Sequence, residues 1–155
     1  MTSPALGLEE EYQAGHALLK LLEQEQAALV NADVESLTML TEEKARIAAH
    51  MSQLAKNRHQ ALDAAGFETT ETGMQNWLAS PQANTANNKT WNELLEIVRS
   101  AKELNRVNGM LISQHMARNQ SALNVLYGNN EQGGNLYGPD GQATTKVGSR
   151  RLVIG

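Results

Sequence analysis

The sequence contains no cysteine, which excludes disulfide bonds, thiolate nucleophiles and thiolate metal sites. Aromatic residues make up only 4% of the chain, and β-branched residues are also sparse, so the composition favours helices. The longest basic run is the pair Arg150-Arg151, and the net charge is −4. We therefore expect no nucleic-acid partner and no binding to an anionic membrane surface, because either would require a basic patch.

Long apolar runs are also missing. No stretch approaches the roughly 18 residues needed to span a bilayer, and the first residues lack the basic and apolar regions of a signal peptide. We expect a cytoplasmic protein without membrane insertion. Its 155 residues are enough for one folded domain and make a second one improbable on size alone.

Helical periodicity, in contrast, is strong in the first half of the chain. Residues 5–31 carry Leu18, Leu22, Glu25 and Leu29 on one stripe. Asp33 is placed to cap a second helix, and Gly66 has the position of the glycine that follows a helix end, with Phe67 packing back. Between them, residues three and four apart form a coiled-coil-like stripe: Leu37, Leu40, Lys44, Ile47, Met51, Leu54, Arg58 and Leu62.

A short helix is expected around Trp77, which we interpret as a local core anchor, followed by a loop over residues 80–88. The last helix is predicted from about residue 88 to 127, ending at Gly128 as its C′ residue. Forty residues would extend roughly 60 Å, so an elongated shape is expected. Its apolar stripe contains Trp91, Leu94, Val98, Ala101, Ile112, Met116, Leu123 and Leu126.

Glycine is concentrated at the end of the chain. Seven of the 12 glycines lie within the last 28 residues, a composition that cannot form a core of its own. The sequence therefore predicts an all-α fold, an elongated antiparallel bundle of three long helices plus a short helix (residues 1–128), with a flexible, Gly-rich, non-helical tail (residues 129–155).

Motifs for catalysis or for cofactor binding are not found. None of the four histidines has a glutamate three residues before it, as a carboxylate-bridged metal pair in a bundle would require. The Glu9-Glu10-Glu11 run is interpreted as a solvated first turn of a helix. We predict no enzyme, no catalytic or metal-binding residue and no cofactor. An alternative class is a histidine phosphotransfer bundle, because "GHALLKLL" around His16 partly matches that signature.

The last helix carries polar residues within its apolar stripe. Asn105, Asn108 and Asn119 lie on the stripe, and Gly109 is beside them. Asparagine in a helical seam fixes packing register, and a glycine within a helix indicates close helix contact or a bend. Two interpretations remain open: these residues specify how the bundle packs, or they form a partly polar groove for a partner segment.

Four short motifs together resemble the FlgN-type flagellar export chaperones: "LTEEKARI" (40–47), "NRVNGMLI" (105–112), "LNVLYG" (123–128) and "LYGPDGQ" (136–142). The resemblance covers nearly the whole chain. It implies a cytoplasmic, non-enzymatic, all-α protein without a cofactor. Such proteins bind hook-filament junction (hook-associated) proteins, prevent their premature assembly and deliver them to the flagellar type III export apparatus.

The resemblance also implies that cargo binds through the C-terminal part. Carried onto this chain, the expected partner-binding residues are Asn105, Asn108, Ile112, Met116, Asn119, Leu123, Leu126, Tyr127, Leu136 and Tyr137. The cargo is expected to present a terminal amphipathic helix. Leu136 and Tyr137 are expected to act as an apolar anchor in the tail. A homo-oligomer formed through the tail remains open, and a purely structural coiled-coil protein is a further alternative.

Overall fold

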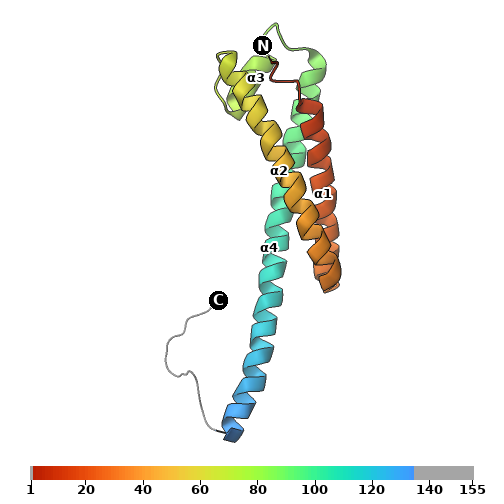
Figure 1. The fold of residues 1–155 in the computed structure, drawn as a ribbon, viewed down its shortest axis with the longest axis vertical. Coiled ribbons are helices and arrows are strands. Elements are labelled where there is room, and N and C mark those ends of the chain that lie inside the picture. The colour runs from red at the N-terminus through yellow and green to blue at the C-terminus, as the bar shows by residue number, and fades with distance from the viewer. Residues whose placement is uncertain (1, 135–155) are drawn as a thin grey trace. The chain divides into compact units, whose positions relative to one another are not determined.

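The computed structural model describes residues 2–134, with side chains to residue 128, as four helices without a strand among them (Figure 1). The helices are α1 (Leu8–Val30), α2 (Val34–Ala64), α3 (Glu71–Leu78) and α4 (Thr85–Gly134). The prediction of an all-α fold with three long helices and one short one is confirmed. Leu136 and Tyr137 lie outside the described residues.

The chain divides into two units, residues 1–112 and residues 113–155. In the first unit α2 runs antiparallel to α1 and to the first part of α4, and the three helices lie side by side (Figure 1). The short α3 lies at the end of this bundle where α1 begins and α2 ends. The second unit contains the remainder of α4, residues 113–134.

Local side chains and backbone set both ends of α2, as predicted. Asp33 caps its first turn by accepting hydrogen bonds from the Ser36 N–H (3.2 Å) and hydroxyl (2.7 Å), and these bonds lower the pKa of the Asp33 carboxyl. At the other end Gly66 has φ +85°. The N–H of Phe67 bonds the Leu62 carbonyl at 2.9 Å, which completes a Schellman motif.

The apolar core is concentrated at the α3 end of the first unit. Phe67 packs back against it, as predicted, and Trp77 is a buried core anchor. Gly73 is required in α3, because an added Cβ would lie 1.8 Å from the Glu68 carbonyl oxygen. The buried members of this core come from all four helices: Leu8, Leu62, Met74, Trp77, Leu78, Trp91 and Leu94.

The limits of α4 differ from the prediction at both ends. The helix begins at Thr85, because the Asn84 side chain accepts a hydrogen bond from the Asn87 N–H at 3.0 Å and so caps it earlier than expected. The prediction that Gly128 ends the helix is wrong, since the helix continues to Gly134. One glycine costs a helix only about 1 kcal/mol relative to alanine, and the next proline is Pro139.

Close helix contact, one of the two explanations offered for Gly109, is found at another glycine. Gly109 is exposed, and an added Cβ would meet nothing within 4 Å. At Gly15 of α1, a Cβ would lie 3.2 Å from Ile97 and 3.5 Å from both Leu94 and Met51. Gly15 therefore permits the close approach of α1, α2 and α4.

The two exposed glycines give a matched stability test. Gly66→Ala places a Cβ at a positive φ and should lower the free energy of unfolding by about 1–2 kcal/mol. Gly109→Ala, with helical backbone and free space, should raise it by about 0.5–1 kcal/mol. Urea denaturation followed by circular dichroism measures both, and a Gly66→Ala variant that is no less stable than the unaltered protein would contradict the assignment of Gly66 as the helix-ending residue.

Candidate functional site

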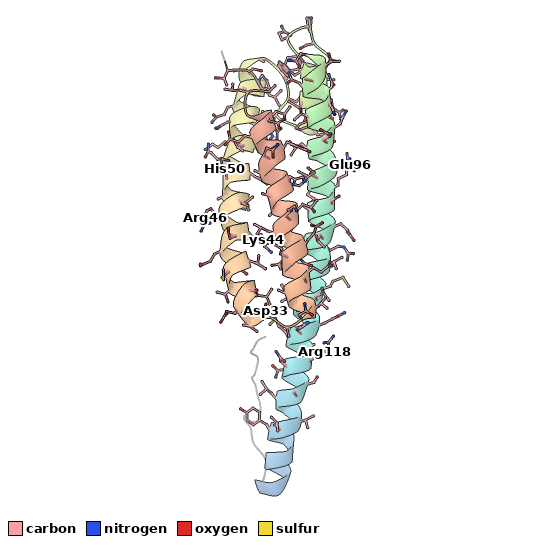
Figure 2. The ribbon with its side chains drawn as sticks, turned by 90° about the vertical axis from the view of Figure 1, so that its right-hand side faces the viewer. Asp33, Lys44, Arg46, His50, Glu96 and Arg118 are labelled. Carbon is pink, nitrogen blue, oxygen red and sulfur yellow. The ribbon has the colours of Figure 1, made fainter. Side chains whose placement is uncertain are left out.

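A buried carboxylate connects the three long helices of the first unit. Glu25 of α1 is only 3% exposed. Lys44 of α2 approaches its two carboxylate oxygens with Nζ at 2.9 and 3.1 Å, and Lys44 lies between α2 and α1, whereas Arg46 points away from the bundle (Figure 2). From α4, the Asn108 Nδ2 donates to Glu25 at 2.9 Å. We call Glu25, Lys44 and Asn108 the polar layer.

Asn108 belongs to the interior of the bundle. Its side chain is 1% exposed, and its amide also donates to the Leu22 carbonyl of α1 at 2.9 Å. These hydrogen bonds hold α4 against α1, which is the packing role that the sequence suggested for Asn108. Asn105, one turn earlier, is exposed, with Oδ1 3.4 Å from the Lys44 ammonium.

A second buried ion pair was missed in the sequence. Glu11 is 4% exposed, and Arg58 of α2 donates to it through Nε at 2.9 Å and Nη2 at 3.2 Å. The Arg58 guanidinium also lies over the Trp91 ring, 4.8 Å from its centroid. The prediction of a fully solvated glutamate run is therefore wrong for Glu11. Neighbouring helical residues point about 100° apart, so one of the three faces the bundle.

An apolar cavity of about 430 Å³ lies among α1, α2 and α4 in the first unit. The polar residues of its lining are Thr41, Lys44, Lys102 and Asn105. Its apolar walls come from residues on all three helices: Gly15, Leu18, Leu22, Ala45, Ala48, Met51, Ile97, Val98 and Ala101.

The second unit, taken by itself, exposes an apolar helix face. Met116, Leu126 and Tyr127 are 64, 61 and 61% exposed, and Leu123 is 44% exposed. At 100° per residue these four and Asn119 lie within about 50° of one line along the helix. We call these five residues the Met116–Tyr127 face. Val125 is equally exposed at 62% but lies on the opposite side of the helix.

The Met116–Tyr127 face is almost uncharged. Within residues 113–128 the only side chain charged at pH 7 is Arg118, which lies about 130° from the centre of the face. Exposed apolar side chains gathered on one helix face are typical of protein–protein contacts. Earlier in α4, the exposed Arg106 bonds Glu103 at 2.7 Å and lowers the pKa of that carboxyl.

The predicted partner-binding residues are therefore not all equivalent. Met116, Asn119, Leu123, Leu126 and Tyr127 share one exposed face of the second unit. In the first unit Ile112 is 40% exposed, Asn105 is exposed and Asn108 is buried.

Neither a cluster of potential metal ligands nor a helix able to span a membrane is found in the described part of the chain. Within residues 2–134, no three His, Asp or Glu side chains are grouped so as to hold a metal ion. No helix in that range is long and apolar enough to cross a membrane. His16 is exposed on α1, with its ring 6.4 Å from that of Tyr12.

An exposed apolar helix face without charges is typical of a helix that contacts another protein. The FlgN protein family model matches residues 1–145. Flagella synthesis protein FlgN of Yersinia enterocolitica is 30% identical over 88% of this chain and 86% of its own length. The corresponding proteins of Salmonella typhimurium (30%, covering 85% and 83%) and Proteus mirabilis (28%, covering 84% and 82%) are also similar.

This chain thus belongs to the FlgN family of flagella synthesis proteins, which confirms the resemblance found in the sequence. The family is one of non-enzymatic chaperones, in agreement with the prediction that the protein is not an enzyme. No solved structure matches the chain.

The polar layer provides a second matched test. Asn108→Ala removes hydrogen bonds to a buried carboxylate and a buried carbonyl, and should lower the free energy of unfolding by about 2 kcal/mol or more. Asn105→Ala removes one exposed contact and should change it by about 0.5 kcal/mol or less. Chemical denaturation of both variants measures the difference. Similar values for the two would show that the polar layer does not stabilise the bundle.

Proposed function

We propose that this protein is a cytoplasmic type III flagellar export chaperone for hook-associated proteins. It binds these hook-filament junction proteins through their terminal helices, prevents their premature assembly and delivers them to the export apparatus. The cargo helix lies along the Met116–Tyr127 face. The observation that carries this proposal is the exposure of four large apolar side chains on one face of a helix.

Family membership supports a role in flagellar assembly. The similar proteins of Yersinia, Salmonella and Proteus are named flagella synthesis proteins, and the family match extends to residue 145, so it includes the Met116–Tyr127 face. The face therefore lies within the part of the chain that matches the family.

The chemistry of the face suits an amphipathic helix. Met116 and Leu123 are two turns apart, and Leu126 and Tyr127 extend the apolar surface by one more turn. A helix that presents residues at i, i+3, i+4 and i+7 would cover it, and the flexible Met116 side chain adapts to different neighbours. Burial of apolar surface from both partners drives binding, so neither ATP nor a cofactor is required to form the complex.

Residues outside this face extend the proposed interface. Ile112 and Asn105, exposed in the first unit, remain proposed contacts. Asn108 would contact cargo only if the polar layer opened. Leu136 and Tyr137 are proposed to hold the bound helix as an apolar anchor.

Opposite faces of the same helix give a direct test of cargo binding. Leu123→Glu places a charge in the proposed contact and should weaken binding of a hook-associated protein by about 2 kcal/mol or more, roughly 30-fold in Kd. Val125→Glu, on the other side of the helix and also exposed, should leave the Kd within about twofold. Isothermal titration calorimetry with purified hook-associated proteins measures both.

Circular dichroism controls for folding, and both variants should retain the helical spectrum because neither side chain is buried. Equal affinities for Leu123→Glu and the unaltered protein would exclude the Met116–Tyr127 face as the cargo site. Absence of any complex with the unaltered protein would instead favour a structural coiled-coil role. A requirement for His16, tested by His16→Ala in a motility assay, would favour phosphotransfer.

The role of the C-terminal residues is tested by truncation after Gly134. Because this removes Leu136 and Tyr137, we expect cargo affinity to fall by about 1–2 kcal/mol, roughly 5- to 30-fold. The full-length double variant Leu136→Ser, Tyr137→Ser should reproduce most of this loss in the same calorimetric titration. If truncation weakens binding and the double variant does not, these two residues are not the anchor.

A further inference from the structure

We propose that the cavity among α1, α2 and α4 of the first unit is a binding site for a medium-chain fatty acid. The hydrocarbon chain lies along the apolar walls, and the carboxylate binds at the end of the cavity that contains Lys102. This site is separate from the proposed cargo site, because every residue of the cavity lining lies between Gly15 and Asn105.

The lining of the cavity changes from apolar to polar along the helix axes. Gly15, Met51 and Ile97 lie together at one end, where a Cβ added to the glycine would be 3.2 Å from Ile97 and 3.5 Å from Met51. At the other end Lys44 and Asn105 approach each other to 3.4 Å. A ligand that matches this gradient has an apolar body and a single polar end.

The size of the cavity favours a hydrocarbon chain over a helix. Between Gly15 and Leu22 the lining extends roughly 10 Å along α1, at a rise of about 1.5 Å per residue. A volume of about 430 Å³ over this length gives a mean cross-section of roughly 40 Å², whereas a helix about 10 Å wide needs roughly 80 Å². A helix is therefore too wide to enter, and an extended acyl chain fits.

The apolar walls provide the driving force for binding the acyl chain. Leu22 and Ala101 are buried, and Leu18, Met51 and Val98 are half-buried. A hydrocarbon chain in the cavity contacts side chains of all three helices, and each methylene group that it removes from water favours binding. Mostly apolar walls with a few polar groups at one end are typical of small-molecule sites.

Small side chains on α2 form the open side of the cavity. Ala45 and Ala48 belong to the lining and are exposed, so solvent reaches the cavity past them. The next alanine, Ala49, is also exposed but lies outside the lining, because neighbouring helical residues point about 100° apart. A larger side chain at position 48 therefore blocks the cavity without replacing a buried core residue.

The charge at the polar end favours an anionic ligand. The Lys44 ammonium is already paired with Glu25 at 2.9 Å. Lys102 is exposed, and within residues 2–128 no carboxylate forms an ion pair with it. A fatty acid carboxylate supplies the missing negative charge, and the Asn105 amide can donate a hydrogen bond to it.

Isothermal titration calorimetry of the full chain with decanoate, below its micelle-forming concentration, tests the proposal. The unaltered protein should bind decanoate at a single site. Ala48→Trp fills the cavity and should weaken binding by about tenfold or more, because the acyl chain loses its apolar contacts. Ala49→Trp, the matched control, should leave the Kd within about twofold. Circular dichroism with and without decanoate confirms that each variant is folded.

The position of the carboxylate is tested by comparing decanoate with the uncharged decanol. Lys102→Gln should weaken decanoate binding about three- to fivefold, the effect of an exposed ion pair, and leave decanol binding unchanged. Lys89→Gln removes an exposed lysine of α4 outside the lining and should leave both affinities within about twofold.

Absence of decanoate binding by the unaltered protein would overturn the proposal and leave the cavity to a side chain of a partner protein. Equal affinities for Ala48→Trp and Ala49→Trp would also overturn it, because decanoate would then bind elsewhere. An equal loss of decanoate and decanol binding in Lys102→Gln would refute the assignment of the carboxylate to Lys102. None of these titrations contains cargo, so their outcome is independent of the function proposed above.

Discussion

The arrangement of the first unit depends on one buried carboxylate. Glu25 is removed from water on α1, and an unpaired buried charge costs several kcal/mol. Its partners come from two other helices, Lys44 from α2 and Asn108 from α4. A shift of either helix by one turn, about 5.4 Å, would break these bonds. The apolar contacts supply most of the free energy of folding, but they would tolerate such a shift better than the polar layer does.

The need of each buried charge for an opposite partner also explains why the two units carry different surfaces. Helices held by Glu11–Arg58 and Glu25–Lys44 can pack in only one register, because each charge needs its opposite. A face without charges accepts any apolar helix of suitable spacing. Internal packing requires the first property. Contact with a helix of another protein requires only the second.

How much of the fold and of the candidate site could be predicted from the sequence depended on how local the interactions are. The ends of α2 at Asp33 and Gly66 were predicted because caps involve residues only a few positions apart. The prediction that α4 ends at Gly128 was wrong, because one glycine adds only a small cost to a long helix. Glu25 and Lys44 were visible as charges on apolar stripes, a signal for buried ion pairs, but their partners depend on how helices pack. Nor does a stripe reveal whether the residues on it are buried.

The one-ended core described for the first unit has a consequence for its dynamics. Large apolar residues of all four helices meet near α3, whereas the connection between α1 and α2 carries the exposed Val30 and Val34 and a residue with positive φ, Ala32. Opening free energies for amide hydrogen exchange should therefore rise along the bundle from this connection toward α3. A protein organised in this way can loosen one end while the other remains folded.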